Sequence, residues 1–153
     1  MSIRRYYSWA LALVLLDQIS KLSAYEYLGG IGNSVDINEY FALTFAHNYG
    51  AAFSFLADSG GWQRYFLSGV SATASVVIVV WMFRTPLQYK FKLISLTLIL
   101  SGAIGNMIDR IANGFVVDFI DLHYQDFYWP IFNFADIFIS IGVLLLIIVD
   151  WKK

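Results

Sequence analysis

The stretch from Gly102 to Asp136 reads GAIGNMIDRIANGFVVDFIDLHYQDFYWPIFNFAD. It places amides, carboxylates and an arginine within or beside strongly apolar runs, namely Asn106, Asp109, Arg110, Asp118, Asn133 and Asp136. Such groups are costly in apolar surroundings unless they are hydrogen-bonded, paired or in contact with water. We therefore expect the functional site to lie in this stretch and the rest of the chain to fold around it.

The composition is that of a membrane protein. Of the 153 residues, 59% are hydrophobic and only 14% are charged, whereas a soluble domain is about half apolar and about a quarter charged. A chain of this length without linkers or repeats is expected to form one domain, residues 1–153. A formal net charge of −1 gives no concentrated basic face, so we expect no nucleic-acid partner. The absence of cysteine excludes disulfides and thiol nucleophiles.

Four apolar segments approach the roughly 20 residues that a helix needs to cross a bilayer. They cover residues 7–26, 65–84, 91–110 and 132–151. Polar residues interrupt the first segment and no small-residue cleavage pattern follows it, so we interpret it as a retained helix and not as a secretory signal. The predicted fold class is an all-α membrane protein, a four-transmembrane-helix bundle with a small β-sheet subdomain on its outer surface.

Basic residues predict the orientation of these spans. They flank both termini and the connection between the second and third spans, and the positive-inside rule makes that side cytoplasmic. They are Arg4, Arg5, Arg84, Lys90, Lys92, Lys152 and Lys153. Both termini are therefore expected in the cytoplasm, with residues 27–64 and 111–131 on the outer side.

The first outer segment, residues 27–64, predicts the sheet. Within Val35–Phe45, apolar Phe41, Leu43 and Phe45 alternate with their neighbours, the period of two typical of a half-buried strand. We expect this sheet to lie on the outer membrane surface.

Two further outer features complete the predicted topology. A short element over Ala51–Leu56 is expected to follow the sheet. The second outer segment, residues 111–131, is short, aromatic and acidic, and we expect it to fold back against the helix ends.

Charged and amide residues interrupt the first and third predicted spans. Asp17 and Lys21 share a helix face and can pair, and such groups should point into the bundle. The pair either positions the helix or also touches a ligand. Asn106, Asp109 and Arg110 fall on one stripe of the third span. The two charged residues favour structural pairing or anchoring, whereas the amide can bind either a neighbouring helix or an extended peptide.

Asp118 and Asp136 are expected at similar depth on the outer side. Alone, Asp118 could be a loop acid and Asp136 a partner of the helix dipole. Together they suggest an acid pair that shares one proton. The ionised member can take a proton from water while the protonated member polarises a carbonyl and later protonates the leaving amine. This chemistry hydrolyses peptides without serine, cysteine or metal.

Competing chemistries have weaker support in the sequence. No nucleophile elbow accompanies His47 or His123, the two histidines. Asp118, Asp121 and His123 leave the remaining ligands of a metal site unspecified, so we expect no metal and no cofactor. Ser20 and Lys21 are adjacent in a helix and point in different directions.

Five motifs in order resemble the type II (lipoprotein) signal peptidases, aspartyl endopeptidases of the bacterial inner membrane. They are Asp17 to Lys21 (DxxxK), His47 to Phe53 (HNYGAAF), Gly105 to Arg110 (GNMIDR), Val116 to Phe119 (VVDF) and Phe132 to Asp136 (FNFAD). The match covers nearly the whole chain, and five motifs on the appropriate predicted membrane sides are highly specific. His47 and Tyr49 occupy variable positions of their motif.

The resemblance implies removal of the signal peptide of prolipoproteins, cut on the N-terminal side of the diacylglyceryl-modified cysteine. It makes Asp118 and Asp136 the catalytic dyad. Supporting or substrate-binding residues would be Asn48, Gly50, Asn106, Arg110, Asn133, Asp17 and Lys21. It also implies an active site near the outer leaflet, contact with membrane lipid and inhibition by globomycin-type peptides. We expect a monomer, lateral substrate entry and an aromatic cap such as Phe41–Phe55.

Two other functions remain open from the sequence. Intramembrane acids also serve proton relays, so a small proton-coupled membrane transporter is the alternative. It is disfavoured because the acids gather at one face and no matching pair of interrupted helices appears. A non-catalytic membrane scaffold is the third possibility.

Overall fold

The structure, a computed structural model, describes residues 2–50 and 60–151. Along the chain, its elements are a helix, a hairpin, two helices, two strands and a final helix. This is the order expected for a helix bundle interrupted by two outer segments. The predicted element over Ala51–Leu56 and residues 51–55 of the predicted cap lie outside the described residues.

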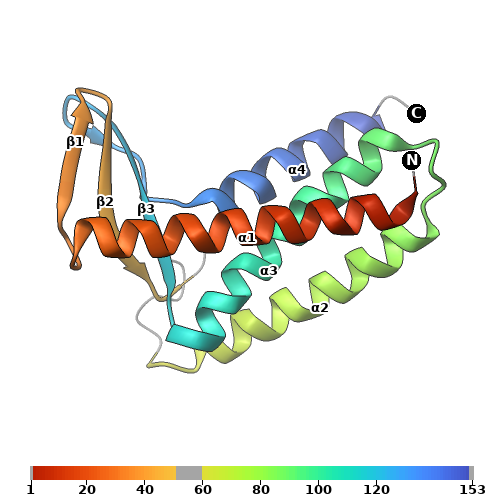
Figure 1. The fold of residues 1–153 in the computed structure, drawn as a ribbon, viewed down its shortest axis with the longest axis horizontal. Coiled ribbons are helices and arrows are strands. Elements are labelled where there is room, and N and C mark those ends of the chain that lie inside the picture. The colour runs from red at the N-terminus through yellow and green to blue at the C-terminus, as the bar shows by residue number, and fades with distance from the viewer. Residues whose placement is uncertain (1, 51–59, 152–153) are drawn as a thin grey trace.

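Four long helices form the body of the molecule (Figure 1). They are α1 (Ile3–Leu28), α2 (Gln63–Arg84), α3 (Lys90–Asn113) and α4 (Phe134–Trp151). All four predicted helices are present, with ends that differ from the predicted ones by a few residues. Gly29 and Gly114 end α1 and α3 in the left-handed conformation, with φ of 73° and 85°, which glycine adopts without a steric penalty.

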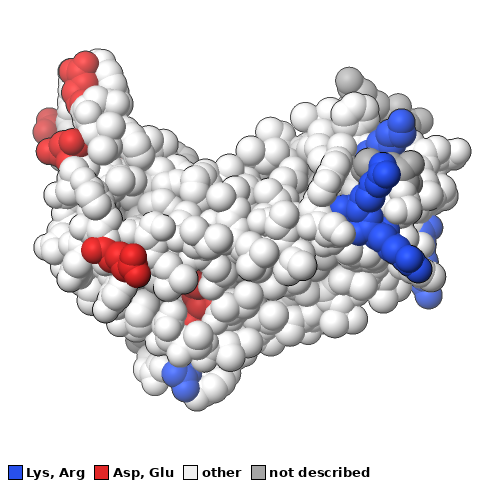
Figure 2. All heavy atoms as spheres, viewed as in Figure 1, with Lys and Arg blue, Asp and Glu red and all other residues white. Residues whose placement is uncertain are grey.

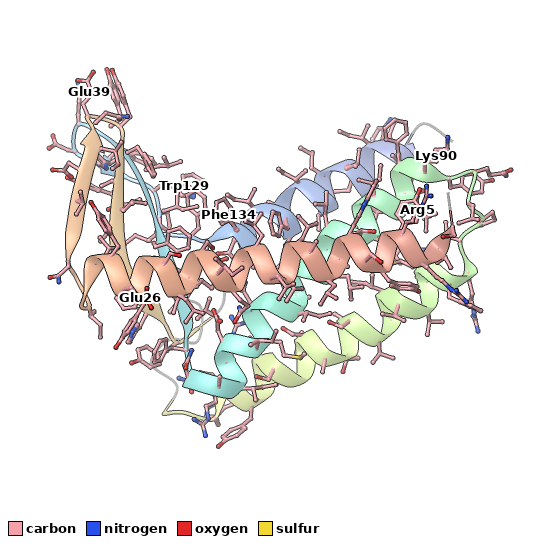
Figure 3. The ribbon with its side chains drawn as sticks, in the orientation of Figure 1. Arg5, Glu26, Glu39, Lys90, Trp129 and Phe134 are labelled. Carbon is pink, nitrogen blue, oxygen red and sulfur yellow. The ribbon has the colours of Figure 1, made fainter. Side chains whose placement is uncertain are left out.

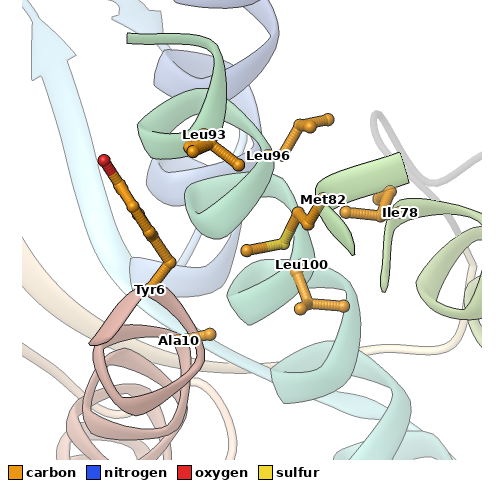
Figure 4. Packing of buried hydrophobic residues seen from close by; sticks show 7 residues of the cluster. All are labelled: Tyr6, Ala10, Ile78, Met82, Leu93, Leu96 and Leu100. Carbon is orange, nitrogen blue, oxygen red and sulfur yellow. The ribbon is translucent and has the colours of Figure 1, made fainter. Parts of the chain in front are cut away.

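Helix α3 is the centre of the bundle and packs against the other three helices. Small residues let α4 approach it closely: a Cβ added at Gly102 would lie 2.3 Å from the carbonyl oxygen of Ala135. Toward the end of the bundle where α1 begins, apolar side chains fill the space between helices (Figure 4), namely Tyr6, Ala10, Ile78, Met82, Leu93, Leu96 and Leu100. This packing leaves the other half of α3 for polar groups.

A four-stranded antiparallel sheet stands at the opposite end of the helices (Figure 1). Its strands, in spatial order, are β1 (Ser34–Asn38), β2 (Phe41–Asn48), β3 (Val116–Tyr124) and β4 (Phe127–Tyr128). A second apolar cluster ties the sheet to the end of α1, namely Ala24, Leu28, Phe45, Val117 and Phe119. The sheet therefore has a fixed position over the helix ends.

The structure corrects the predicted sheet in two respects. The prediction built the sheet from residues 27–64, but β3 comes from the second outer segment and pairs with β2 from Phe41↔Leu122 to Asn48↔Val116. That segment shows no alternation because Val116 to Phe119 are buried at every position. The predicted strand from Phe41 to Phe45 is present within β2, but its side chains do not alternate as predicted, because Ala42 and Phe45 are buried while Phe41 and Leu43 are only partly buried. A bulge between Leu43 and Ala46 interrupts the register with β3.

Helices α2, α3 and α4 are long and apolar enough to span a membrane, by length and composition. Helix α1 has 26 residues, about 39 Å at 1.5 Å per residue, but Asp17, Lys21 and Glu26 interrupt it. Three of the four predicted spans are thus supported among the described residues. The crossing of the membrane by α1 stays a prediction.

Charges are separated along the long axis of the molecule. Figure 2 shows most of the acidic side chains in view toward the sheet end and most of the basic ones at the opposite end. Glu26 and Glu39 lie at the sheet end, whereas Arg5 and Lys90 lie where α1 begins and α3 begins (Figure 3). The first residues of α1 and the last of α4 are at this basic end. The distribution is the one that the positive-inside rule favours for a bundle with both termini inside.

Candidate active site

Asp118 lies in β3 with only 3% of its surface exposed. Its two carboxylate oxygens accept hydrogen bonds from two side-chain amides: Asn133 Nδ2 donates to Oδ1 at 2.6 Å and Asn48 Nδ2 to Oδ2 at 3.0 Å. Asn48 ends β2 beside Val116. The β2–β3 pairing therefore brings this donor to the carboxylate.

Asp136 lies in the first turn of α4, where local sequence orients it. Asn133 precedes the helix, its Oδ1 accepts from the backbone N–H of Asp136 at 3.0 Å, and its own N–H donates to Asp136 Oδ2 at 3.3 Å. This reciprocal pair is a capping box, which satisfies N–H groups that a helix start leaves unpaired. Asn106 Nδ2 donates to the other oxygen, Oδ1, at 2.8 Å. The two aspartates therefore share Asn133 as a common hydrogen-bond partner.

Lys21, Asp17 and Asp109 form a buried ion triad next to Asp118 and Asp136. Lys21 Nζ lies 2.8 Å from Asp17 Oδ2 and 2.8 Å from Asp109 Oδ2, and it donates to Asn106 Oδ1 at 3.0 Å. The predicted pairing of Asp17 with Lys21 is confirmed, and Asp109 joins it. A Cβ added at Gly105 would meet Asp17 Oδ2 at 2.5 Å, so this glycine provides the space that the triad occupies.

Each acid of the triad also binds the backbone beside one of the paired aspartates. Asp17 Oδ1 accepts from the N–H of Ala135 at 2.9 Å, one residue before Asp136. Asp109 Oδ2 accepts from the N–H of Val117 at 3.3 Å, one residue before Asp118. The ion triad thus connects α1 and α3 to both segments that carry the pair.

Arg110 lies one turn after Asn106 on α3, and its side chain reaches the loop after β2. Its Nη2 donates to the carbonyl oxygen of Gly50 at 2.9 Å, and Gly50 N–H donates to Asn48 Oδ1 at 3.0 Å. Its Nε is buried and has no partner among the described residues. The guanidinium therefore fixes the Asn48 loop and retains one unused donor.

Burial and charge balance favour a proton on the aspartate pair. Burial raises the pKa of the Asp118 carboxyl to about 7, and the charge of Asp136 adds to the rise, against the lowering effects of Asn48, Asn133 and Lys21. The cluster also contains more carboxylates than cations. Its ionisable members are Asp17, Asp109, Asp118, Asp136, Lys21 and Arg110. One shared proton reduces this imbalance.

The raised pKa of Asp118 predicts that folded stability falls as pH rises. The folded protein holds this proton more tightly than the unfolded chain, whose carboxyl has a pKa near 3.8. The extra stability is complete below about pH 4 and lost by about pH 7, at up to roughly 1.4 kcal/mol per pH unit. We expect the melting temperature in detergent to fall by roughly 5 °C or more between pH 5 and 8.

Asp118→Asn is the control for this pH dependence and should show a flatter profile. Burial lowers the pKa of His47, which gives the opposite trend, stability gained as pH rises, but both proteins carry this histidine. The comparison therefore isolates the carboxyl. Parallel profiles of the two proteins would show that Asp118 is ionised at neutral pH.

A cavity of about 650 Å³ is lined by Asp136 and by Asn48, the hydrogen-bond partner of Asp118. It lies on α3 between α2 and α4, two helices that barely contact each other among the described residues. Its polar end is formed by Asn48, Asn106, Arg110 and Asp136. The remaining walls are mostly apolar, namely Leu67, Val70, Ser71, Ala74, Ile99, Ala103, Val116, Trp129, Pro130, Ile131, Phe132, Ile137, Ile139, Ser140 and Ile141.

Every site residue predicted from the sequence falls in this one region, and the structure adds two features. Gln18 Nε2 donates to Asp109 Oδ1 at 3.0 Å and to Asp17 Oδ2 at 3.2 Å. An amide next to an aspartate in a predicted span was the available signal for it. The segment from Trp129 to Phe132 lines the cavity, and no local pattern indicates that role.

Comparisons with known proteins agree with this arrangement. Residues 9–152 match the family described as Signal peptidase (SPase) II. A lipoprotein signal peptidase of Cellvibrio japonicus is 46% identical over 149 residues, covering 94% of this chain and 85% of the relative. One of Alteromonas mediterranea is 42% identical over 146 residues, covering 95% of this chain and 80% of the relative.

A solved structure gives the same result in three dimensions. A bacterial membrane enzyme determined by the in meso method at 2.3 Å resolution superposes with a TM-score of 0.83 and 31% identity, covering 97% of this chain and 88% of that one. The fold and these similarities define the class of the protein, a membrane peptidase of the aspartic type. Within that class, the chain belongs to the signal peptidase II family. This membership favours the peptidase over the transporter and the scaffold.

Proposed function

We propose that this protein removes the signal peptide of prolipoproteins by cutting on the N-terminal side of the diacylglyceryl-modified cysteine, with Asp118 and Asp136 as the catalytic dyad. The observation that carries the proposal is the shared Asn133, which hydrogen-bonds both carboxylates, at 2.6 Å and 3.3 Å. Family membership supports the substrate class.

The dyad would hydrolyse the peptide with a single shared proton. The ionised carboxylate takes a proton from water as the water oxygen attacks the scissile carbonyl carbon, and the protonated carboxyl gives its proton to the carbonyl oxygen. In the second step the tetrahedral carbon expels the amine, which receives the proton that the first carboxylate had taken from water. One hydroxyl of that carbon returns its proton to the other carboxylate as the carbonyl re-forms, which restores the starting state of the dyad. The raised pKa of Asp118, about 7, supports this scheme, because it keeps a proton available on the pair near neutral pH.

The neighbouring polar residues would hold the dyad and the substrate. Asn48, Asn106 and Asn133 donate to the carboxylates. Arg110 has a buried Nε without a partner among the described residues and lines the cavity, so it can donate to a substrate carbonyl. Gly50 would position Asn48 through its backbone N–H. Asp17 would hold the backbone N–H of Ala135, next to Asp136, and Lys21 would orient Asn106.

Shape and polarity of the cavity support entry from the bilayer. The cavity lies between α2 and α4, and the exposed surfaces of both helices are strongly apolar. A lipid-modified peptide can therefore enter laterally while its acyl chains stay in lipid. We place both termini in the cytoplasm of a bacterial inner-membrane protein, with the dyad near the outer leaflet. A globomycin-type peptide would occupy the same cavity, and the proposed chemistry requires neither a second copy of the chain nor a cofactor.

The function is tested by incubating the purified protein with a synthetic precursor that carries a diacylglyceryl cysteine. Mass spectrometry should find a single cut that leaves the modified cysteine as the new N-terminus. The same peptide without the lipid should be cleaved far more slowly. No cleavage of the lipidated precursor, or a cut elsewhere, would contradict the proposal.

A further inference from the structure

The segment from Trp129 to Phe132 forms the edge of the sheet next to the cavity. Trp129 N–H donates to the carbonyl oxygen of Leu122 at 2.9 Å, and Phe132 and Ile120 exchange two backbone hydrogen bonds of 3.1 Å and 2.8 Å. The segment therefore continues antiparallel to β3 after β4. In Figure 3, the labelled Trp129 and Phe134 mark this passage between the sheet and α4.

Ile131 has a free backbone donor and acceptor in this edge. Successive residues of an extended chain direct their N–H and C=O groups to opposite sides. Phe132 uses both groups toward β3, and a one-residue register shift separates it from Trp129, whose N–H also points to β3. The groups of Ile131, next to Phe132, therefore face away from the sheet. Neither group has a partner among the described residues. The flanking residues do not compete, since Pro130 has no N–H and Asn133 directs its N–H to Asp136 and its carbonyl to Ile137.

The unpaired backbone groups of Ile131 lie where the substrate of the proposed function would bind. Ile131 is only partly exposed and lines the same cavity as Asp136 and Arg110. Unpaired backbone groups in a mostly apolar cavity are unfavourable, and an incoming extended peptide has the donors and acceptors to satisfy them. Adding a strand to a free sheet edge is a general mode of peptide recognition.

We propose that the precursor peptide binds in extended form as an additional strand on the Trp129–Phe132 edge, with one peptide residue forming hydrogen bonds to both the N–H and the C=O of Ile131. The inference rests on the proposed function and deepens it. These two bonds set the register of the peptide in steps of two residues, and so determine which peptide bond reaches the dyad. Alternate side chains of the peptide then face the cavity.

Ile131→Pro tests the bond from the Ile131 N–H. Proline removes this donor, and an edge position whose N–H points away from the sheet tolerates it. Ile131→Val keeps the donor and is the matched control. We expect Ile131→Pro to raise KM for the lipidated precursor about tenfold relative to Ile131→Val, which is the scale of one hydrogen bond. The value of kcat and the melting temperature should change little.

Binding to the inactive Asp136→Asn protein separates this inference from the proposed function. Ile131→Pro in that background should weaken binding of the uncut precursor about tenfold. If the active enzyme cuts no lipidated precursor, the proposed function fails, yet this binding difference can still be measured. Equal binding by Ile131→Pro and Ile131→Val would overturn the edge-strand proposal.

An ester scan of the precursor provides a test that does not depend on the proline variant. Replacing each backbone N–H near the cleavage site in turn by an ester oxygen should reveal one position that weakens binding to the Asp136→Asn protein about tenfold. That position should keep its effect in the Ile131→Pro background, because proline retains the carbonyl oxygen that accepts this second bond. A scan without a sensitive position would overturn the proposal whatever the behaviour of the proline variant.

Discussion

Asp136→Asn is expected to lower kcat/KM for a lipidated precursor by at least about 10³-fold, the scale of a lost general acid–base group. Asparagine keeps the size of the side chain and an acceptor for Asn106, but it can neither take a proton from water nor share one with Asp118. The helix cap is retained in part, because Asn133 Oδ1 still accepts from the backbone N–H of residue 136. Activity is measured by product formation from the lipidated precursor, and folding by the melting temperature in detergent.

Asp121→Asn is the matched control for this loss. Asp121 is another buried aspartate of β3, but its Oδ2 accepts a hydrogen bond from Thr44 at 2.8 Å, away from the dyad. Its replacement should change activity less than about threefold. Asp118→Asn should behave as Asp136→Asn does. Retention of activity by either dyad variant, or an equal loss in Asp121→Asn, would argue against the dyad.

The helices and the polar cluster could be predicted because their signals are local. A bilayer requires about 20 apolar residues in one run, and few charges interrupt such runs in this chain. Those charges then had to face the bundle interior, which paired Asp17 with Lys21, whereas Asp109 was predicted only as a charge partner or anchor of the third span. The ion pairs of 2.8 Å among these residues follow from that cost of exposing charge to lipid.

The sheet could not be predicted fully because its pairing is not local. Phe41 and Leu122 are register partners although they lie far apart in the sequence, and nothing in a short window selects such a partner. Asp118 made the prediction harder, since a carboxylate in a strand buried at neighbouring positions breaks the alternation that identifies strands. The free edge at Ile131 depends on this pairing and could not be foreseen either.

The role of Asn133 shows the same division between local and non-local signals. Its spacing to Asp136 fits a capping box, which a sequence can indicate. Its side-chain hydrogen bond to Asp118 depends on β3 passing over the start of α4. One residue thus performs a local structural task and joins the two halves of the proposed dyad.

Lys21→Met is expected to have the largest effect on stability of any single change in the bundle. Lys21 is 3% exposed, and its ammonium group contacts Asp17, Asp109 and Asn106 within 3.0 Å. Its removal leaves two buried carboxylates without a cation, at a cost of roughly 3–5 kcal/mol. For a chain of this size, the melting temperature should fall by roughly 10 °C. Thermal unfolding in detergent at constant pH measures this effect.

Lys92→Met is the matched control, because Lys92 also pairs with an aspartate at 3.0 Å but that partner, Asp150, has 40% of its side chain exposed. Water can solvate the carboxylate left behind, so the loss should be about 1 kcal/mol or less. Combining Lys21→Met with Asp109→Asn should recover part of the stability lost in Lys21→Met, because it removes one of the two buried carboxylates left without a cation. Equal losses in the two lysine variants would show that burial of the triad does not determine its strength.

The Lys21 variant should also lose activity out of proportion to its folded fraction. Asp17 and Asp109 accept hydrogen bonds from the N–H groups of Ala135 and Val117, the residues that precede the two dyad aspartates. Without the lysine these acids separate or take up protons, and both backbone anchors weaken together. The carboxylates of the dyad then lose their mutual alignment although neither of them is altered. A temperature series should therefore show reduced kcat even well below the melting point, which a loss of stability alone would not produce.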